Sequence, residues 1–209
     1  MNILLPVCSL ILAYLLGSIP TAVWIGKWFY GIDVRDAGSG NAGATNTIRV
    51  LGLKAGIPVL LIDVFKSWLA VAMAGLMAAG SFTGESLVLF RMAAGAIAVL
   101  GHVFPVFAGF KGGKGVASLV GVIIALYWQA FMIVLIWFAI VFAITRYVSL
   151  ASITSALLFP VIVLFVFQEQ STPLIILAFL VALFVPITHR RNIGRLIHGE
   201  ENKLDFKKK

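Results

Sequence analysis

Long hydrophobic stretches, separated by short polar segments, follow one another along this chain. A membrane-spanning α-helix needs about 20 consecutive apolar residues. Five stretches are close to or above that length: Ile3–Gly26, Ile57–Gly80, Leu87–Phe107, Val148–Phe167 and Pro173–Thr188. A further stretch, 115–144, has 30 residues, which is too long for one untilted helix. This pattern predicts an all-α membrane protein.

The positions of the basic residues predict how often segment 115–144 crosses the membrane. If the chain turns at Tyr127-Trp128-Gln129, the segment forms two short helices and 15 of the 16 Lys and Arg residues lie in the cytoplasm, with only Arg91 near the outer side. A single crossing would place Arg146 and the basic tail outside, against the positive-inside rule. We therefore predict one integral membrane domain, 1–209, with seven transmembrane helices, two of them short. Its N-terminus is expected outside, its C-terminus in the cytoplasm, and the chain in the inner (cytoplasmic) membrane.

Composition agrees with this prediction. The chain is 61% hydrophobic and only 11% charged, whereas soluble domains are about 45–50% apolar and about 25% charged. The net charge of +8 comes from short basic clusters between apolar runs, which is typical of topology signals in a membrane protein and not of a nucleic-acid-binding surface. The single cysteine, Cys8, cannot form an internal disulfide.

The first predicted cytoplasmic segment, at about 27–55, contains the run GSGNAGATN at 38–46. Closely spaced glycines let successive backbone N–H groups point at one anion. The neighbouring Ser, Thr, Asn and Arg side chains add donors, and a guanidinium suits a phosphate. The alternative is a flexible loop, which does not need such polar density. The predicted substrate-binding residues of this segment are Ser39, Asn41, Thr45, Asn46 and Arg49.

The second cytoplasmic segment, at about 108–115, resembles a phosphate loop but is not a Walker A motif. Ala108 stands where that motif has its first glycine, and Gly115 replaces the Ser or Thr that would hold magnesium. We predict a phosphate cradle without a nucleotide. The alternative is a positive-inside loop with glycine hinges. The predicted binding residues are Lys111, Gly112, Gly113, Lys114 and Gly115.

The third cytoplasmic segment, 189–209, begins at the inner end of the last predicted helix. If that helix continues, His189 and Asn192 share one face. A basic membrane anchor explains the arginines and the lysine tail but does not explain these two residues. Elsewhere, Asp63 and Lys66 are expected to pair inside a span, as structural bracing, because unpaired charges there are costly. No acyltransferase HxxxxD signature and no carboxylate cluster for a metal are present in the sequence, so we expect no metal and no cofactor.

These motifs together resemble the bacterial acyl-phosphate:glycerol-3-phosphate acyltransferase family. The resemblance rests on GSIPT at 17–21, GSGNAGATN at 38–46 with Arg49, FKGGKGVA at 110–117, RYVSLASI at 146–153 and the His189 segment. It covers nearly the whole chain, with the motifs in the family's order. One departure is Arg191, which stands where the family usually has Glu.

The resemblance implies a seven-helix membrane enzyme that transfers a fatty acyl group from acyl phosphate to glycerol 3-phosphate in phospholipid synthesis. A soluble partner enzyme would supply the acyl phosphate. The implied catalytic residues are Ser39, Lys114, His189 and Asn192, with Arg49 at the acceptor. A transporter for an organic phosphate is the rival interpretation. It would need polar residues at the membrane midplane and repeated broken helices, whereas the polar groups here gather toward one predicted face.

Overall fold

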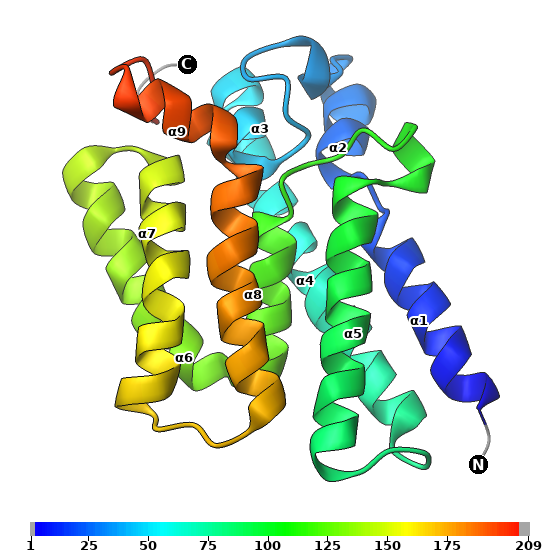
Figure 1. Cartoon of the computed structure of the whole chain (residues 1–209). Helices are drawn as coiled ribbons and strands as arrows, with labels where there is room; N and C mark the ends of the chain where they lie inside the picture. Colours follow the sequence, from blue (N-terminus) through cyan, green and yellow to red (C-terminus); the bar gives the residue numbers. More distant parts are fainter. Residues whose placement is uncertain (1–2, 205–209) are drawn as a thin grey trace. The chain divides into compact units, whose positions relative to one another are not determined.

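The computed structural model describes residues 3–204, which form helices and connecting loops without a β-strand. The described chain divides into two compact units, residues 3–126 and 127–204, which are treated separately below (Figure 1). Met1 and the end of the lysine tail, for which outer and cytoplasmic positions are predicted, lie outside the described residues.

The first unit contains five α-helices and the beginning of a sixth. They are α1 (Leu4–Gly17), α2 (Thr21–Tyr30), α3 (Ala44–Leu51), α4 (Leu53–Ala78), α5 (Gly84–Val103) and the start of α6 (Val116–Thr145), with single turns η1 (Val34–Asp36) and η2 (Val106–Ala108). The predicted span 3–26 is therefore two helices, bent by 43°. The bend lies at Ser18-Ile19-Pro20, because Pro20 has no N–H with which to continue α1.

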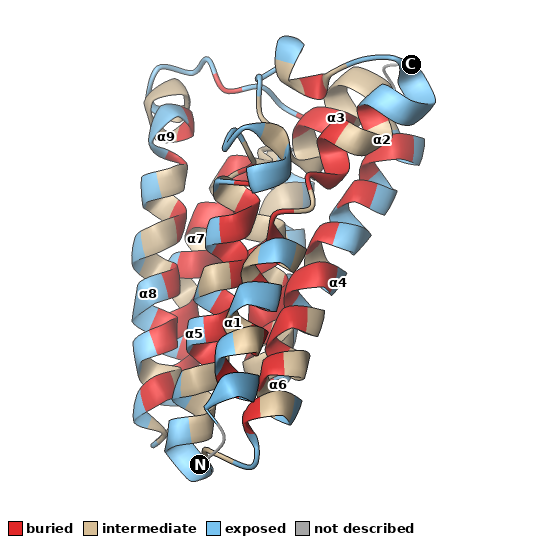
Figure 2. Ribbon diagram, turned by 90° about the vertical axis from the view of Figure 1, so that its right-hand side faces the viewer, coloured by how far each residue is buried: buried red, intermediate tan, exposed pale blue. Residues whose placement is uncertain are grey.

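Small residues allow α1, α4 and α5 to pack closely in this unit. Ala13, Ala70, Ala74, Ala94 and Ala98 form a buried cluster, and the buried faces of these helices are visible in Figure 2. A Cβ on Gly17 would collide with the backbone of Ala98, and one on Gly101 would lie 2.5 Å from the Tyr14 carbonyl oxygen. Helix interfaces in membranes rely on such close backbone approach, because lipid tails are as apolar as leucine.

The second unit contains the remainder of α6, α7 (Val148–Val161), the π-helical turn η3 (Ile162–Val166), α8 (Thr172–Thr188) and α9 (Arg190–Ile197). Helices α7 and α8 pack against each other. Helix α9 bends away from α8 by 63° at His189. The condition under which the sequence places His189 and Asn192 on one face, a helix that continues through both residues, is therefore not met. The bend lies at His189, whose backbone dihedral angles (φ −99°, ψ 10°) are not those of an α-helix. His189 stands within the polar run Thr-His-Arg-Arg at 188–191.

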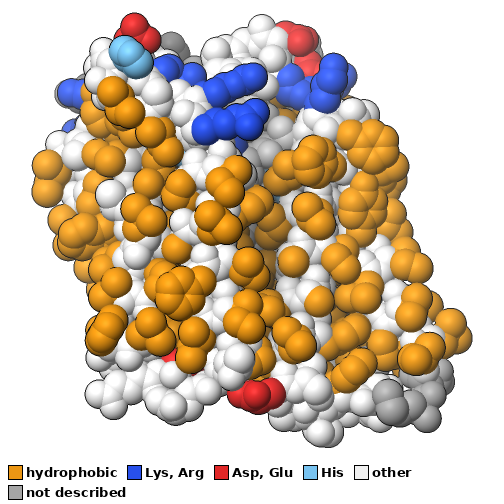
Figure 3. All heavy atoms as spheres, viewed as in Figure 1, with side chains coloured by type: hydrophobic (Ala, Val, Ile, Leu, Met, Phe, Trp, Pro, Cys, Tyr) orange, Lys and Arg blue, Asp and Glu red, His pale blue; other side chains and the backbone are white. Residues whose placement is uncertain are grey.

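The distribution of side chains is that of an integral membrane protein. Within residues 3–204, four helices are long and apolar enough to cross a bilayer, or up to six elements if each bent pair counts as one span. In each unit taken separately, hydrophobic side chains cover the flank that Figure 3 shows, and the Lys and Arg side chains visible in this view gather at one end.

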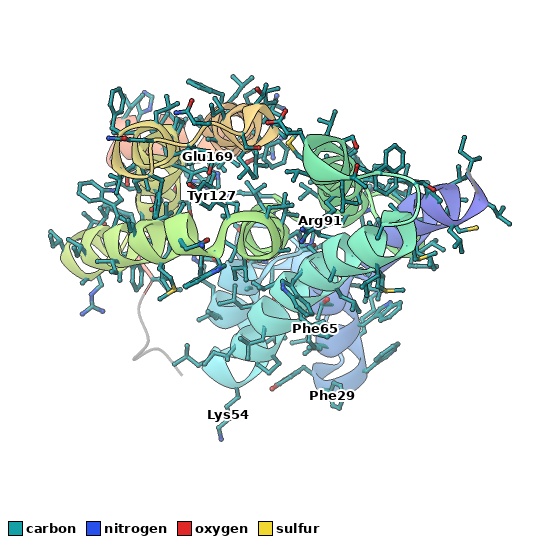
Figure 4. The ribbon with its side chains drawn as sticks, turned by 90° about the horizontal axis from the view of Figure 1, so that it is seen from below. Phe29, Lys54, Phe65, Arg91, Tyr127 and Glu169 are labelled. Atoms are coloured by element: carbon teal, nitrogen blue, oxygen red, sulfur yellow. The ribbon has the colours of Figure 1, made fainter. Side chains whose placement is uncertain are left out.

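Tyr127 interrupts α6 with non-helical dihedral angles (φ −151°, ψ 63°), at the place where the sequence predicts a turn. Just before this break, the Nη2 atom of Arg91 on α5 donates a 2.9 Å hydrogen bond to the Ala125 carbonyl oxygen. Carbonyl groups at a helix end lack intrahelical partners. Arg91, the one basic residue predicted near the outer side, therefore caps the first part of α6. Figure 4 shows it from below.

Replacing Arg91 with Met is expected to lower the thermal unfolding midpoint of the purified protein in detergent. A hydrogen bond to a charged group contributes about 1.5–3 kcal/mol, and the Ala125 carbonyl would lose its partner. Lys54→Met is the matched control, because Lys54 is exposed and projects away from the helices (Figure 4). Equal midpoints for the two variants would show that the cap has no role in stability.

Candidate phosphate-binding loops and the histidine segment

The first glycine-rich loop, residues 31–43, connects α2 to α3 and is held in shape by Asn46 on α3. The Asn46 Oδ1 atom accepts hydrogen bonds from the Ser39 N–H (2.7 Å) and the Ser39 hydroxyl (3.1 Å). Its Nδ2 atom donates to the carbonyl oxygens of Val34 (2.7 Å) and Ala37 (3.1 Å). Gly38 has φ +62°, and a Cβ there would collide with Asn46 Oδ1, so this turn requires glycine.

These four bonds correct the prediction for Asn46. A side-chain amide has two donor hydrogens and an oxygen with two lone pairs, and all of them are used within the loop. Asn46 is also 2% exposed. We therefore assign it the role of holding Ser39 in place and no direct contact with substrate. Ser39 itself is exposed.

The other predicted residues of this segment lie around the start of α3. Thr45 is the second residue of the helix, Asn41 precedes it in the loop, and Arg49 follows one turn later. All three are half-buried. Helix α3 is fixed against α4, since a Cβ on Gly56 would collide with the Ile48 side chain. The position of Arg49 is thus determined by close helix packing.

Arg35 connects the first loop to the second loop, residues 104–115. It forms a two-pronged ion pair with Asp33, with N···O distances of 3.0 and 2.7 Å. Its Nη1 atom donates to the carbonyl oxygens of Ala108 (2.9 Å) and Lys111 (3.3 Å). The hydrogen bond from the Arg35 side chain holds the pKa of the Asp33 carboxyl below its ordinary value of 3.8, although burial opposes this shift. Arg35 is not among the residues predicted from the sequence, because the two carbonyl groups that it binds in the second loop lie more than 70 residues away.

Two backbone N–H groups of the second loop, which the sequence predicts to bind phosphate, are used in hydrogen bonds within the protein. The Gly112 N–H donates to the Val103 carbonyl oxygen (3.1 Å) and the Gly113 N–H to that of His102 (3.2 Å). These two N–H groups cap the end of α5 and do not point at an anion. The glycines are needed for another reason: a Cβ on Gly112 would collide with the His102 carbonyl oxygen, and one on Gly113 with the His102 ring. The prediction that Gly112 and Gly113 bind phosphate through their N–H groups is corrected accordingly.

The charged groups of the second loop remain candidates for binding phosphate. Lys111 is exposed and Lys114 is half-buried. Gly115, with φ +81°, turns the chain into the start of α6. A cavity of about 520 Å³ lies where the two loops meet, lined by Arg35, Asp36, Gly40, Ala108, Gly109, Lys111 and Gly112. The structure therefore brings the first two predicted segments together within one unit.

The third segment lies in the second unit. His189 is 4% exposed, at the bend between α8 and α9. Its Nδ1 atom is 2.9 Å from the Val185 carbonyl oxygen. A carbonyl can only accept, so Nδ1 carries the hydrogen. In the neutral ring, Nε2 is then a hydrogen-bond acceptor.

Glu201 organises the surroundings of Asn192. One Glu201 carboxylate oxygen accepts from Asn192 Nδ2 (2.6 Å) and the Ser149 hydroxyl (2.9 Å), and the other from Arg195 Nε (2.7 Å). Burial raises the pKa of this carboxyl, but the hydrogen bonds from Arg195, Asn192 and Ser149 outweigh burial and leave it below its ordinary value. Glu201 is not among the residues predicted from the sequence, because it stands in a polar tail ten residues from Arg191.

No group of three or more His, Cys, Asp or Glu residues within 3–204 is arranged to hold a metal ion.

Comparison with known proteins shows extensive similarity. The family model described as glycerol-3-phosphate acyltransferase matches residues 7–199. The glycerol-3-phosphate acyltransferase of Fusobacterium nucleatum is 44% identical over 199 residues, which cover 95% of this chain and 98% of that protein. The Listeria monocytogenes enzyme of the same name is 45% identical, covering 94% and 95%.

Solved structures agree with these matches. The crystal structure of PlsY, an integral membrane glycerol 3-phosphate acyltransferase, in its glycerol 3-phosphate form is 36% identical to this chain. Its TM-score is 0.84, and the match covers 96% of each chain. The lysophosphatidic acid form gives a TM-score of 0.77 at 35% identity. The chain is thus an integral membrane protein that belongs to the glycerol-3-phosphate acyltransferase family.

Proposed function

We propose that this chain transfers a fatty acyl group from acyl phosphate to the hydroxyl group of glycerol 3-phosphate. The products are 1-acyl-glycerol 3-phosphate and inorganic phosphate, an early step of phospholipid synthesis. One observation carries this proposal most strongly: the fold and 96% of the chain match a solved acyltransferase in its glycerol 3-phosphate form. The joined glycine-rich loops of the first unit support it, because both proposed substrates carry phosphate.

Charge is the main physical demand of this reaction. Two phosphate groups must approach each other, and their repulsion grows as the local dielectric constant falls. Arg49, Lys111 and Lys114 supply positive charge to offset that repulsion, and fixed donors hold the reactants in line. We assign Ser39 and Arg49 to the acceptor and the lysines of the second loop to the phosphate that leaves.

The chemistry itself needs no cofactor, because acyl phosphate is an activated mixed anhydride. The acceptor oxygen bonds to the carbonyl carbon, the bond from that carbon to the phosphate oxygen breaks, and the hydroxyl proton goes to a nearby base. His189, with its Nε2 an acceptor in the neutral ring, orients the hydroxyl group or takes its proton; the phosphate of the acceptor is the other base available. Asn192 is proposed to assist as a donor.

Donor choice tests the proposed reaction. We expect purified enzyme to use palmitoyl phosphate and to give no measurable transfer from palmitoyl-CoA. A thioester places no phosphate beside the reacting carbon, so the stabilisation by Lys111 and Lys114 of the charge that develops there would be lost. The assay follows labelled glycerol 3-phosphate into lipid. Comparable rates with the two donors would contradict the assignment of the second loop. Inorganic phosphate should compete with the donor.

The rival function, transport of an organic phosphate, makes the opposite prediction. Proteoliposomes would accumulate glycerol 3-phosphate without forming lipid. The acyltransferase relatives favour the enzyme. A soluble enzyme that forms acyl phosphate is the proposed partner, since the donor must be made before it reaches this protein.

We also propose seven spans, an outer N-terminus, a cytoplasmic C-terminus and an active site that faces the cytoplasm, in the inner membrane. The distribution of basic residues supports this orientation. In a Cys8→Ser background, a cysteine at Gln170 is expected to react with an impermeant maleimide in intact cells. A cysteine at Lys209 should react only after the cells are lysed. Labelling at 209 in intact cells would overturn the orientation.

A further inference from the structure

A cluster of buried polar side chains lies beside the second loop, within the first unit. Its members come from three elements: Thr21 begins α2, Asp63 and Lys66 lie on α4, and His102 lies near the end of α5. All four are at most 7% exposed. The predicted ion pair is confirmed, with Lys66 Nζ 2.9 Å from Asp63 Oδ1.

Asp63 Oδ1 is the centre of this cluster. Besides Lys66, it accepts a hydrogen bond from the Thr21 hydroxyl (3.0 Å) and lies 3.5 Å from His102 Nδ1. Lys66 Nζ also donates to the Ile19 carbonyl oxygen (2.7 Å), in the bend between α1 and α2. The cluster therefore joins the bend, α4 and the end of α5.

His102 extends the cluster to the second loop in two ways. Its carbonyl oxygen accepts the hydrogen bond from the Gly113 N–H. Its ring lies directly against Gly113, because a Cβ on Gly113 would collide with Nε2. A Cβ on Gly113 would also lie 3.0 Å from the Ala42 carbonyl oxygen. Gly113 is therefore enclosed by the His102 ring and by the first loop. The His102 ring thus supports the loop residue that immediately precedes Lys114.

We propose that His102, oriented by Asp63, is a positioning residue that sets the location of Gly113 and hence of Lys114. This inference rests on the proposed function, in which Lys114 holds a phosphate. Bracing alone does not explain the cluster, since well-packed apolar residues often replace a buried ion pair without loss of stability. Apolar residues could not, however, supply the Asp63 oxygen that lies 3.5 Å from His102 Nδ1. In this proposal that oxygen fixes the rotation of the His102 ring, which lies against Gly113.

The test compares two double variants that both remove the ion pair. Asp63→Leu with Lys66→Met removes the carboxylate oxygen that lies 3.5 Å from His102 Nδ1. Asp63→Asn with Lys66→Met keeps an oxygen in the place of Oδ1. We expect the leucine variant to raise the KM for acyl phosphate, the substrate assigned to the second loop, roughly tenfold or more. The KM for glycerol 3-phosphate should stay unchanged, and kcat should change less than the KM for acyl phosphate. The asparagine variant should restore that KM.

Two further variants separate positioning from stability. Thr21→Val removes a different partner of Asp63 and should leave both KM values unchanged. Val99→Ala removes buried volume from α5, one turn before His102, and should lower stability without raising either KM. Unchanged KM values in the leucine variant would overturn the positioning role. Equal increases of KM in the leucine and asparagine variants would overturn it too, and either result would mean that the cluster only stabilises the fold.

A spectroscopic measurement keeps this inference separable from the proposed function. A nitroxide on Phe107→Cys, an exposed residue of the second loop, is placed in a Cys8→Ser background. The leucine variant should change the label's mobility, and the asparagine variant should return it to that of the parent. If the parent fails to use acyl phosphate, the proposed function fails, but this comparison still decides whether Asp63 and His102 position the loop. An identical spectrum in all three proteins would overturn the positioning role.

Discussion

Replacing Arg49 with Lys is expected to lower kcat/KM by about 10²–10³-fold, within the roughly 2–5 kcal/mol of binding energy that loss of one partner of a hydrogen-bonded charge pair costs. A guanidinium presents a planar fork of donors that matches two phosphate oxygens, whereas an ammonium is a point charge. The packing of Ile48 against Gly56 fixes α3 on α4, so the shorter head group cannot be moved closer to the substrate.

The measurement is a steady-state titration of both substrates with purified protein. The loss should appear mainly as a raised KM for glycerol 3-phosphate, with the thermal midpoint close to that of the parent. Arg190→Lys is the control for the same change of head group, because Arg190 is exposed and is assigned no contact with substrate. A near-normal KM for glycerol 3-phosphate in Arg49→Lys would remove Arg49 from the acceptor site.

Replacing Glu201 with Leu is expected to inactivate the enzyme and to destabilise the second unit. Three donors lose their acceptor at once: Asn192, Arg195 and Ser149. The ion pair with Arg195 accounts for little of the lost stability, because the Arg195 side chain is 34% exposed and solvent screens its charge. The larger part is the loss of an acceptor for the buried Asn192 amide, which costs about 1–3 kcal/mol. Activity should fall by roughly 10²-fold or more, since Asn192 is no longer held within the tolerance that catalysis requires.

Glu200→Gln is the matched control, because Glu200 is exposed and immediately adjacent. Arg191→Glu should also retain substantial activity, since Arg191 is exposed and the carboxylate beside Asn192 is supplied by Glu201. Near-normal activity in Glu201→Leu would show that the network is dispensable. Loss of activity in Arg191→Glu with the fold intact would show that the third segment depends on this arginine.

Acid sensitivity gives the Glu201 network a second readout. The folded-state pKa of Glu201 lies below its ordinary value of 4.5. Its contribution to stability is therefore complete above pH 4.5 and is lost as the pH falls below that value through the folded-state pKa. Between pH 5 and pH 3, thermal midpoints of the parent should fall more steeply than those of Glu201→Gln. Parallel curves would contradict the shift.

The sequence predicted the helices much better than the contacts around the candidate site. Runs of apolar residues marked α4, α5, α7 and α8 because their length has a direct physical meaning in a bilayer. The length of an apolar run could not show the bend at His189, since the run ends at Thr188. The roles of Asn46 and Glu201 depend on partners that folding brings together, and no local pattern distinguishes a loop amide that binds substrate from one that binds its own backbone.

The division into two units also bears on the order in which the protein is made. Arg35, Asn46, the buried cluster around Asp63 and both glycine-rich loops are complete within residues 3–126, so their contacts can form while the ribosome is still adding the rest. Domains fold as units from the N-terminus during synthesis. The histidine segment must wait for Glu201 to emerge. A transcript cut short before codon 201 would yield a chain with finished glycine-rich loops but without the Glu201 acceptor of Asn192, inserted in the membrane and without activity.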